Sequence, residues 1–317
     1  EKVTIIGMGN VALDIARILA LSPEEVAKTD IPHHVQKQLK ESKVKEINLV
    51  ARRGPLQAAF TKTGTKEIPD LENAIAVVSA DELILEEQSV KILEETGDKR
   101  IIDNLKFLNS ISDNVEVEGK RTIRFLFRRS PQEILGGDSV KSLTMVHNEL
   151  FADDHGKIHL KMTDVQEDVE TGLLFRSIGY RVRPVDGIQV NMARGLVSNE
   201  EGRVVDVETN EVLAGEYVVG WAKRGASGVI GTNKPDSLAT VNKLVEDIAD
   251  AEGTALDMPQ VDRVTSLLKS KDIHFVPFED WKLLDQVELL EGESKSKPRE
   301  KVVKIADMIK IINEQKL

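Results

Sequence analysis

Two groups of residues near the start of the chain have the types and spacing to bind a dinucleotide. Gly7, Gly9 and Ala12 form a GxGxxA pattern directly after the apolar run at residues 3–6. In such a pattern the first glycine permits a tight turn, the second lets a phosphate approach the backbone, and the small third residue lets the following helix pack closely on its strand. The N–H groups at the start of that helix then face a pyrophosphate. The expected contact residues are Gly7, Gly9, Asn10, Val11 and Ala12.

Arg52 and Arg53 indicate which dinucleotide is bound. They follow a predicted strand at residues 47–51, at the position where an NAD-binding domain carries an acid for the ribose hydroxyl. A guanidinium there suits a 2′-phosphate, because its planar fork binds oxyanions through two hydrogen bonds. Either group alone also fits an ordinary glycine turn or a solvated strand end, but their order along the chain favours NADP(H). The arginines lie about forty residues beyond the turn, against about 20 in the standard unit, and a helical insertion at residues 22–44 accounts for the excess.

The composition limits the classes of function. The chain has 317 residues and 40% apolar content, enough for one large or two ordinary domains, and its formal charge of −11 argues against a nucleic-acid groove. The absence of cysteine excludes disulfides, thiolate catalysis and iron–sulfur ligation by this chain, so redox chemistry must use a bound organic cofactor. His33 and His34 have no carboxylate or cysteine at ligand spacing, and the other histidines are scattered, so the sequence does not support a metal site. No apolar run approaches the length of a bilayer span, so we expect a soluble protein or fragment.

The order of the predicted elements favours an α/β fold. Strands and helices alternate through the first part of the chain, which is typical of a parallel sheet, and the later β segments look like antiparallel additions to it. We expect strands at 3–6, 47–51, 74–78, 114–118, 122–128, 140–148, 173–178 and 216–219, and helices at 10–21, 81–95, 101–108, 235–252, 258–270 and 302–312.

The chain also resembles a known family. Residues 10–17 and 52–61 are similar to the NADP half of the adrenodoxin-reductase type of ferredoxin–NADP reductases, the family of mitochondrial NADPH:adrenodoxin oxidoreductase. The similarity covers nearly the whole chain, because it continues through residues 29–31, 128–131, 177–180, 217–225, 278–281 and 297–301.

The resemblance implies a division of the chain into two domains. Residues 1–179 would be a three-layer, Rossmann-like NADP-binding domain, with a parallel sheet and antiparallel additions. Residues 180–317 would be the C-terminal half of a discontinuous FAD-binding domain. The chain has no second GxGxxG pattern for the FAD adenylate. We therefore expect the N-terminal FAD-binding segment to precede Glu1 and to be missing from this chain.

A further group of residues, from Trp221 to Ile230, combines an indole, two basic residues and a loop rich in glycine. Such a loop brings backbone N–H groups close to a flat ligand. The resemblance implies that Trp221, Gly228, Val229 and Ile230 contact the flavin ring. The alternative is that Trp221 is a core aromatic residue and that the glycines only make turns.

Asp14 and Gly64 are two further positions where the resemblance bears on the reaction. It implies that Asp14 joins a hydrogen-bonded network near the flavin and acts as a catalytic residue, whereas the plainer reading is a solvated side chain or a pair with Arg17. Gly64 stands where the family usually has a glutamate that helps to place the nicotinamide, and this loss should weaken that placement.

Basic residues in this acidic chain predict a docking face for an acidic protein. Lys66 keeps the charge of an arginine that, in the family, belongs to the ferredoxin-docking face. Arg124, Arg128 and Arg129, with Arg121 beside them, form a further basic cluster in sequence. Such a patch can steer an acidic ferredoxin by complementary potential. The alternative for this cluster is an ordinary solvated strand face.

The resemblance implies an NADPH:ferredoxin oxidoreductase with FAD and NADP as cofactors. A hydride would pass from NADPH to FAD, and single electrons would then pass to a [2Fe–2S] ferredoxin. The alternative is a catalytically inactive nucleotide-binding or structural subunit derived from such a reductase. A small-molecule NADP dehydrogenase lacks a recognisable acid/base pair here. We expect no nucleic-acid partner and no transmembrane segment. In a eukaryote the location would be the mitochondrial matrix or the periphery of the inner membrane, with peripheral membrane association, and otherwise the cytoplasm.

Overall fold

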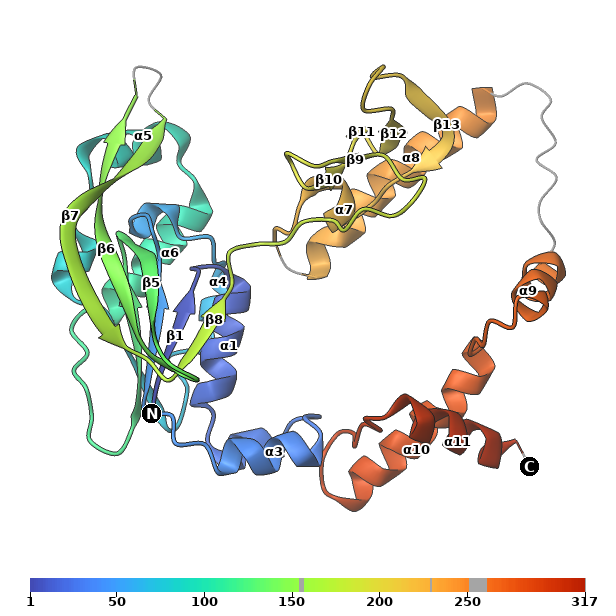
Figure 1. Cartoon of the computed structure of the whole chain (residues 1–317), viewed down its shortest axis with the longest axis horizontal. Coiled ribbons are helices and arrows are strands. Elements are labelled where there is room, and N and C mark those ends of the chain that lie inside the picture. Colours follow the sequence, from blue (N-terminus) through green and yellow to red (C-terminus); the bar gives the residue numbers. More distant parts are fainter. Residues whose placement is uncertain (154–156, 229, 251–260, 317) are drawn as a thin grey trace. The chain divides into compact units, whose positions relative to one another are not determined.

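The computed structural model describes residues 1–153, 157–228, 230–250 and 261–316. The chain divides into two compact units (Figure 1). The first unit consists of Glu1–Ile178 and Val276–Leu317, and the second unit consists of Gly179–Phe275. The assignment of residues 1–179 to NADP and of residues 180–317 to FAD stays a prediction.

A five-stranded parallel sheet forms the centre of the first unit. Its strands are β1 (Lys2–Ile6), β2 (Glu46–Val50), β3 (Ala74–Val77), β4 (Arg121–Leu126) and β8 (Leu173–Arg176). They lie in the order β3-β4-β2-β1-β8 and pair in parallel throughout. The predicted α/β class is confirmed. Because the carboxyl ends of parallel strands meet at one edge, the turn after β1 and the arginines after β2 lie at the same edge of the sheet.

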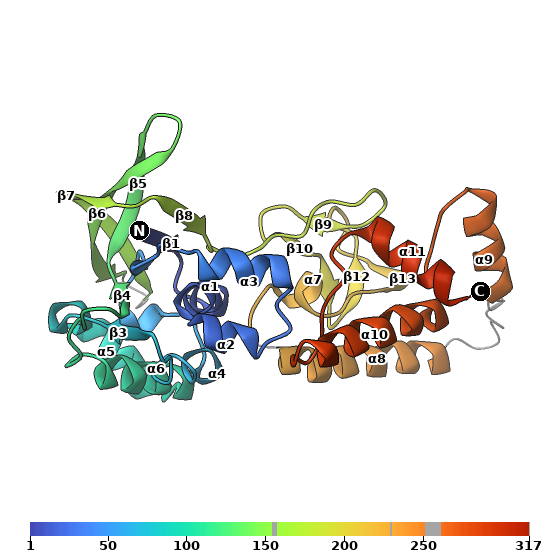
Figure 2. The same cartoon turned by 90° about the horizontal axis from the view of Figure 1, so that it is seen from below.

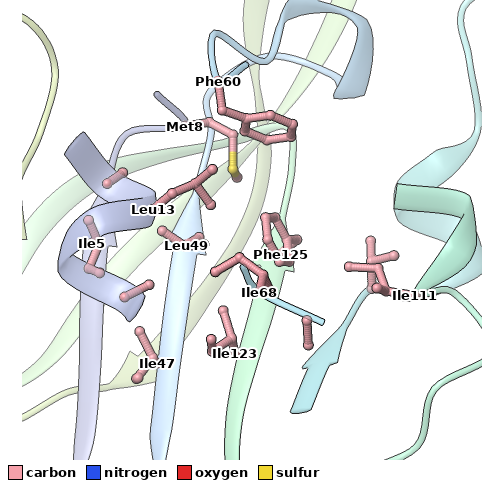
Figure 3. Packing of buried hydrophobic residues seen from close by; sticks show 14 of the residues in the cluster. Ile5, Met8, Leu13, Ile47, Leu49, Phe60, Ile68, Ile111, Ile123 and Phe125 are labelled. Atoms are coloured by element: carbon pink, nitrogen blue, oxygen red, sulfur yellow. The ribbon is translucent and has the colours of Figure 1, made fainter. Parts of the chain in front are cut away.

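One face of this sheet carries the main hydrophobic core (Figure 3). Ile5, Leu49 and Phe125 come from three neighbouring strands in aligned register, and all three are fully buried. Phe60 packs edge-on against Phe125, with the ring centroids 6.3 Å apart. Burial of each such side chain contributes about 1.5–3 kcal/mol relative to exposure, so this face fixes the strands that position the site.

Helix α1 (Asn10–Ala20) packs on this core because its sheet-facing residues are small. Ala12 and Ala16 are fully buried and leave room for a close approach of the helix to the sheet. The other helices of the unit are α2 (Pro23–Ala27), α3 (His33–Lys40), α4 (Lys62–Thr65), α5 (Glu87–Thr96), α6 (Lys99–Ser110), α10 (Phe278–Ser294) and α11 (Ile305–Gln315), with 3₁₀ turns at Pro55–Gln57 and Ala80–Leu83.

The helical insertion predicted between β1 and β2 is confirmed as α2 and α3. Helix α2 begins with a capping box, in which the Ser22 hydroxyl accepts a hydrogen bond from Glu25 N (3.1 Å) and the Glu25 carboxylate accepts one from Ser22 N (2.7 Å). The C-terminal segment of the chain contacts this insertion. Lys297 Nζ donates to Ile31 O (2.6 Å) and joins two stretches that lie 266 positions apart.

The opposite face of the parallel sheet is covered by a second sheet (Figure 2). Its strands are β5 (Arg129–Gly136), β6 (Val140–Ala152) and β7 (Ile158–Glu170), all antiparallel. Leu143 and Met145 of β6 pack against Val50 of β2 and fill the space between the sheets. The predicted antiparallel strands therefore form a separate sheet stacked on the parallel one, instead of extending its edges.

The strand predicted at residues 114–118 is wrong. This segment has no regular structure, and its alternating valines are exposed, Val115 to 72% and Val117 to 42%. The alternation has no core to face here, and Lys120 N closes a turn on Val117 O (3.1 Å). The helix predicted at 81–95 is also wrong in its first part, because the structure separates the 3₁₀ turn at Ala80–Leu83 from α5.

The second unit contains short antiparallel strands and longer helices. Its strands are β9 (Val190–Asn191), β10 (Leu196–Val197), β11 (Asn199–Glu200), β12 (Arg203–Val205) and β13 (Val212–Tyr217). Its helices are α7 (Trp221–Arg224), α8 (Asn233–Asp250) and α9 (Val261–Ser270), with a 3₁₀ turn at Ile230–Thr232. The predicted start of α9 at residue 258 lies outside the described residues.

A three-residue polar cluster joins the strands of the second unit to α8. Asp247 accepts two hydrogen bonds from the Arg203 guanidinium, at 2.7 and 2.5 Å, and a third from the Tyr217 hydroxyl at 2.7 Å. These bonds, the arginine's first, hold the pKa of Asp247 down to about 2. The carboxylate therefore stays ionised well below neutral pH.

Among the described residues, no helix combines the length and the apolar character needed to cross a bilayer.

Candidate functional site

The fold itself requires glycine at position 7. Gly7 has φ +139°, a conformation that residues with side chains rarely adopt, and a β-carbon built there would lie 2.0 Å from Ser177 O. Gly7 N donates to Val50 O (2.9 Å), and Ser177 N donates to Ile6 O (2.7 Å). These contacts fix the turn between the ends of three strands, which is the tight turn predicted from the sequence.

Gly9, in contrast, is not required by any contact among the described residues. Its backbone is extended, at φ −115°, and a β-carbon built there has no described atom within 4 Å. Gly9 is also the N-cap of α1, and no side chain caps this helix. The first N–H groups of α1 therefore face an open approach, which fits an anionic ligand at a helix N-terminus.

Asn10 uses its side chain within the protein. Its Oδ1 accepts hydrogen bonds from Thr61 N (2.9 Å) and from the Thr61 hydroxyl (3.2 Å), which ties α1 to the segment after Phe60. These two bonds engage only the side-chain oxygen of Asn10, so its backbone and its amide nitrogen can still face a ligand. Val11 is 37% exposed at the first turn of α1. The predicted cofactor contacts of Asn10 and Val11 remain predictions.

Arg52 and Arg53 are exposed, and within the described part of the chain neither guanidinium has a hydrogen bond or an ion pair. They directly follow Ala51, whose N–H donates to Leu126 O (2.8 Å). Since β1 and β2 are neighbours, two unpaired cations lie at the same sheet edge as the Gly7 turn. This arrangement can bind a ligand with one anionic group at the turn and another at the arginines.

The other arginines of the predicted basic cluster are engaged inside the first unit. Arg128 donates to the carbonyls of Asp81 (2.9 Å) and Ile84 (2.8 Å), and Arg129 pairs with the carboxylates of Glu82 and Glu167. Their charges are thus largely neutralised by contacts within the fold.

Arg121 and Arg124 lie elsewhere on β4. Arg121 donates to Leu19 O (2.9 Å) and Leu21 O (2.8 Å), and burial lowers its pKa. Arg124 pairs with Glu116. The four arginines therefore do not gather into one patch, because β4 separates Arg121 from Arg128 by its full length. Lys66, in contrast, is exposed and has no partner within the described residues. The docking role of these residues remains a prediction.

Asp14 is paired with Arg17, which was the alternative to a catalytic role for this residue. Its carboxylate lies 3.2 Å from Arg17 Nη2, and Arg17 also pairs with Glu67. Its catalytic role is not tested by these contacts. Gly64 lies close beside α1, because a β-carbon there would be 2.6 Å from Asn10 Oδ1. The glycine thus accommodates the contact between α4 and α1.

In the second unit, Trp221 is partly exposed and stacks on Tyr180, with ring centroids 5.8 Å apart. Gly228 has φ +76°, and Ile230 is 91% exposed. Trp221 is therefore not a core residue, and a flat surface and an apolar side chain remain accessible. Val229 lies outside the described residues.

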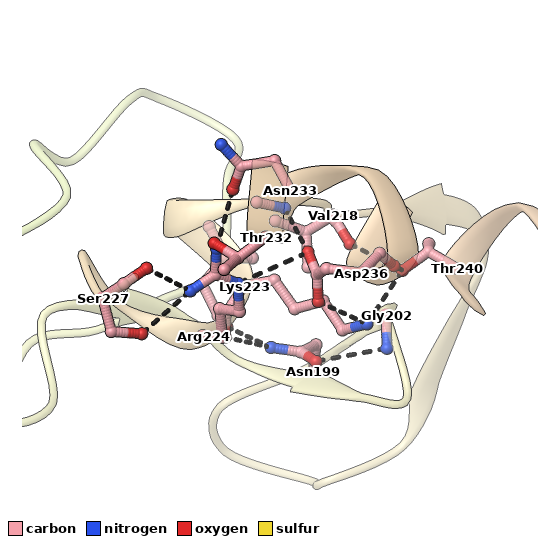
Figure 4. A network of polar contacts seen from close by, with 12 residues as sticks. Asn199, Gly202, Val218, Lys223, Arg224, Ser227, Thr232, Asn233, Asp236 and Thr240 are labelled. Carbon is pink, nitrogen blue, oxygen red and sulfur yellow. Dashed lines mark hydrogen bonds and ion pairs between the residues drawn. The ribbon is translucent and has the colours of Figure 1, made fainter. Parts of the chain in front are cut away.

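Asp236 and Arg224 hold the loop that carries these residues (Figure 4). Asp236 accepts a hydrogen bond from Gly220 N (2.7 Å) and pairs with Lys223 (3.2 Å). The Arg224 guanidinium donates to Ser227 O (2.7 Å) and Asn233 Oδ1 (2.7 Å). Burial opposes ionisation of Asp236, but the Gly220 hydrogen bond and the Lys223 charge keep its pKa below the ordinary value.

The residues that support the site could hardly be recognised from the sequence. Asp236 lies in the first turn of α8, where an acid is favourable at any helix start. Thr61 and Asn148 contribute through contacts with residues far away in sequence, at 51 and 96 positions respectively. No local pattern distinguishes such residues from ordinary polar positions.

The fold and the site define an α/β protein of the Rossmann-like dinucleotide-binding class. No family model matches the chain. NADPH-ferredoxin reductase FprA of Mycobacterium leprae is 37% identical over 312 residues, which cover 98% of this chain and 66% of the relative. The mitochondrial NADPH:adrenodoxin oxidoreductase of Homo sapiens is 34% identical over 323 residues, covering 98% and 64%. The structure of Mycobacterium tuberculosis FprA in complex with NADPH superposes with a TM-score of 0.86 at 35% identity, covering 98% and 67%.

This chain belongs to the adrenodoxin-reductase type of ferredoxin–NADP reductases. The resemblance seen in the sequence is thereby confirmed. The chain spans about two thirds of the length of the relatives it matches.

Proposed function

We propose that this chain carries the NADP-binding part and a portion of the FAD-binding part of an NADPH:ferredoxin oxidoreductase. The observation that supports this most is the pair of unpartnered guanidiniums of Arg52 and Arg53 beside the Gly7 turn. The relatives of this chain are named NADPH-ferredoxin reductase and NADPH:adrenodoxin oxidoreductase. The Gly7 turn with Arg52 and Arg53 would hold NADPH, and Trp221, Gly228 and Ile230 would contact FAD. Together these cofactors would supply hydride transfer to the flavin, from which the two electrons would pass singly to a [2Fe–2S] ferredoxin and the proton to solvent.

The residues at the sheet edge fit NADP(H). The uncapped start of α1 would hold the pyrophosphate through backbone N–H groups, and the open space beside Gly9 gives it access. Arg52 and Arg53 would bind the 2′-phosphate and exclude NAD(H) by leaving it without that contact. Their exposure without an internal partner means that no existing ion pair has to be broken on binding.

The second unit would present Trp221, Gly228 and Ile230 to the flavin, as proposed from the family. The Tyr180–Trp221 stack offers an aromatic surface, and the bonds of Arg224 and Asp236 keep the loop in place before a ligand arrives. This preorganisation reduces the ordering that binding requires.

For docking of the ferredoxin, Lys66 is the strongest candidate among the residues proposed. It is exposed and unpaired in the described structure, whereas Arg124, Arg128 and Arg129 already face carboxylates or carbonyls. Those arginines would attract an acidic partner more weakly, because the nearby carboxylates and carbonyls offset their charges.

The alternative function is a nucleotide-binding or structural subunit without catalysis. Gly64 favours it, since the family's glutamate for placing the nicotinamide is absent and a β-carbon there would press on Asn10. Both functions keep NADP binding and differ only in electron transfer.

Electron transfer decides between them. The full-length protein that contains this chain is purified, and its visible absorbance spectrum is recorded. Reduction of a [2Fe–2S] ferredoxin by NADPH is then followed. The proposed reductase shows a flavin spectrum and ferredoxin-dependent oxidation of NADPH. A preparation that binds NADPH, takes up FAD and still transfers no electrons would establish the subunit instead.

The relatives differ in their location. The mammalian enzymes are named mitochondrial, and the mycobacterial relatives come from bacteria. We extend the mitochondrial location, including association with the inner-membrane periphery, only to a eukaryotic source, and propose the cytoplasm for a bacterial one.

A further inference from the structure

Asn148 supports the backbone between Arg52 and Arg53 through a side-chain hydrogen bond. Its side chain is buried, with 5% of the residue exposed. The side-chain amide donates both of its hydrogens, one to Arg52 O (2.8 Å) and one to the Ser130 hydroxyl (2.9 Å). Asn148 thus contacts the peptide bond between Arg52 and Arg53, although 96 positions separate it from Arg52.

Backbone hydrogen bonds close this contact into a ring. Asn148 N donates to Arg128 O (2.7 Å), and Arg128 N donates to Arg53 O (3.1 Å). Arg128 itself is held at φ +53°, a left-handed conformation that is unfavourable for a residue with a side chain. The backbone carbonyl of Arg52 is therefore held by the Asn148 side chain. The backbone carbonyl of Arg53 is held by the N–H of Arg128, whose own backbone is strained.

A β-bulge directs Asn148 to this position. The pairing of β6 with β7 shifts register between Val146 and Asn148, so that the side chain after the bulge is turned relative to a regular strand. Bulges often re-aim side chains beside functional sites. The Oδ1 atom of Asn148 is buried and has no partner within the described structure. A residue serving stability alone gains little from an unpaired buried oxygen, so the value of Asn148 lies in its two donated hydrogens.

The arginines need such support because their own side chains have none. Their exposed guanidiniums have no partner within the described residues, so the backbone is what fixes the origin and the initial direction of each side chain. A bidentate contact to a phosphate depends on that direction.

We propose that Asn148 is a positioning residue that sets the preference for the 2′-phosphate, acting through the backbone of Arg52. This inference rests on the proposed function, since it assumes that Arg52 and Arg53 bind that phosphate. It adds a residue of the antiparallel sheet to the determinants of cofactor choice.

The test compares the affinities of purified protein for NADP⁺ and NAD⁺ by isothermal titration calorimetry. Asn148→Asp keeps the shape of the side chain but places an oxygen against Arg52 O. We expect the affinity for NADP⁺ to fall about fivefold to tenfold, the loss of roughly one hydrogen bond's contribution, and that for NAD⁺ to change by less than about twofold. Ser130→Ala is the matched control, because it removes the other acceptor of the same amide and should leave the ratio unchanged. If Asn148→Asp does not fold, Asn148→Ser is used, whose shorter side chain cannot reach Arg52 O.

Equal losses for NADP⁺ and NAD⁺, or no loss for either, would overturn the inference and leave Asn148 a structural residue. Arg52→Ala is measured in parallel. If that variant loses the preference for NADP⁺ while Asn148→Asp keeps it, only the inference fails. If the wild-type protein has no preference for NADP⁺, the proposed function fails and the inference fails with it.

Discussion

At the scale of single residues, charge alone does not identify a functional arginine in this chain. Arg52 and Arg53 resemble Arg128 and Arg129 in sequence, since each pair follows an apolar strand. In the structure, the second pair is bonded to carbonyls and carboxylates of its own unit, and the first pair has no internal partner. What separates binding from structural arginines is the presence of acceptors from other elements, which the sequence does not display.

The two glycines of the turn should respond differently to the same change. Gly7→Ala places a β-carbon against Ser177 O at a positive φ, and we expect it to lower the free energy of unfolding by roughly 2–6 kcal/mol. Gly9→Ala meets no described atom, so its stability should stay within about 0.5 kcal/mol of the wild type while NADP⁺ affinity falls, because the methyl group occupies the approach to α1. Urea unfolding and NADP⁺ titration measure the two effects. A Gly9→Ala variant that binds NADP⁺ normally contradicts the assignment of the turn.

Lys66 should influence the ferredoxin and not the nucleotide. Lys66→Glu reverses an exposed, unpaired charge, so we expect the KM for ferredoxin to rise about threefold to tenfold at low ionic strength and the difference to shrink above about 0.3 M salt. Lys106→Glu on α6 is the matched control, since that lysine is also exposed. Equal effects of both variants would show a response to net charge and no docking face at Lys66.

At the scale of elements, the sequence predicted what local patterns control. The GxGxxA turn, with its small third residue at Ala12, and the helical insertion at residues 22–44 each depend on residues within a few positions, and both were found. The alternation at residues 114–118 failed because a strand also needs a neighbour and a core, and those valines have neither. The separate antiparallel sheet was missed for the same reason, since stacking on the parallel sheet depends on contacts such as Leu143 with Val50.

The loop that Asp236 and Arg224 hold should loosen in acid through Asp236. The folded-state pKa of this carboxyl lies below its ordinary value, so its ion pair stabilises the loop at neutral pH and is lost as the pH falls below about 3.8 through the depressed pKa. Asp236→Asn should therefore be less stable than the wild type at pH 7, and the difference should be smaller at about pH 3, below the ordinary pKa of 3.8. Fluorescence of Trp221 in a Trp281→Phe background follows the loop. A difference that is the same at both pH values would mean that the charge of Asp236 does not hold it.

At the scale of the whole molecule, the class of protein and the edge of the sheet that carries the candidate site could be predicted from the sequence. The turn and the arginines are each recognisable locally, and the order of parallel strands brings them together. The residues that support them could not be predicted, because Asn148 and Thr61 act across 96 and 51 positions in the chain. The chain belongs to the adrenodoxin-reductase type of ferredoxin–NADP reductases and spans about two thirds of the length of these relatives.

The central claim is that Arg52 and Arg53 make this a protein that selects NADP(H), and one comparison tests it most directly. The affinities for NADP⁺ and NAD⁺ are measured for the wild type and for the double variant Arg52→Ala, Arg53→Ala. Because each charged hydrogen bond contributes about 1.5–3 kcal/mol, we expect NADP⁺ affinity to fall by about 30-fold or more and NAD⁺ affinity to change little. Equal losses for the two nucleotides would contradict the claim, because the arginines would then not recognise the 2′-phosphate.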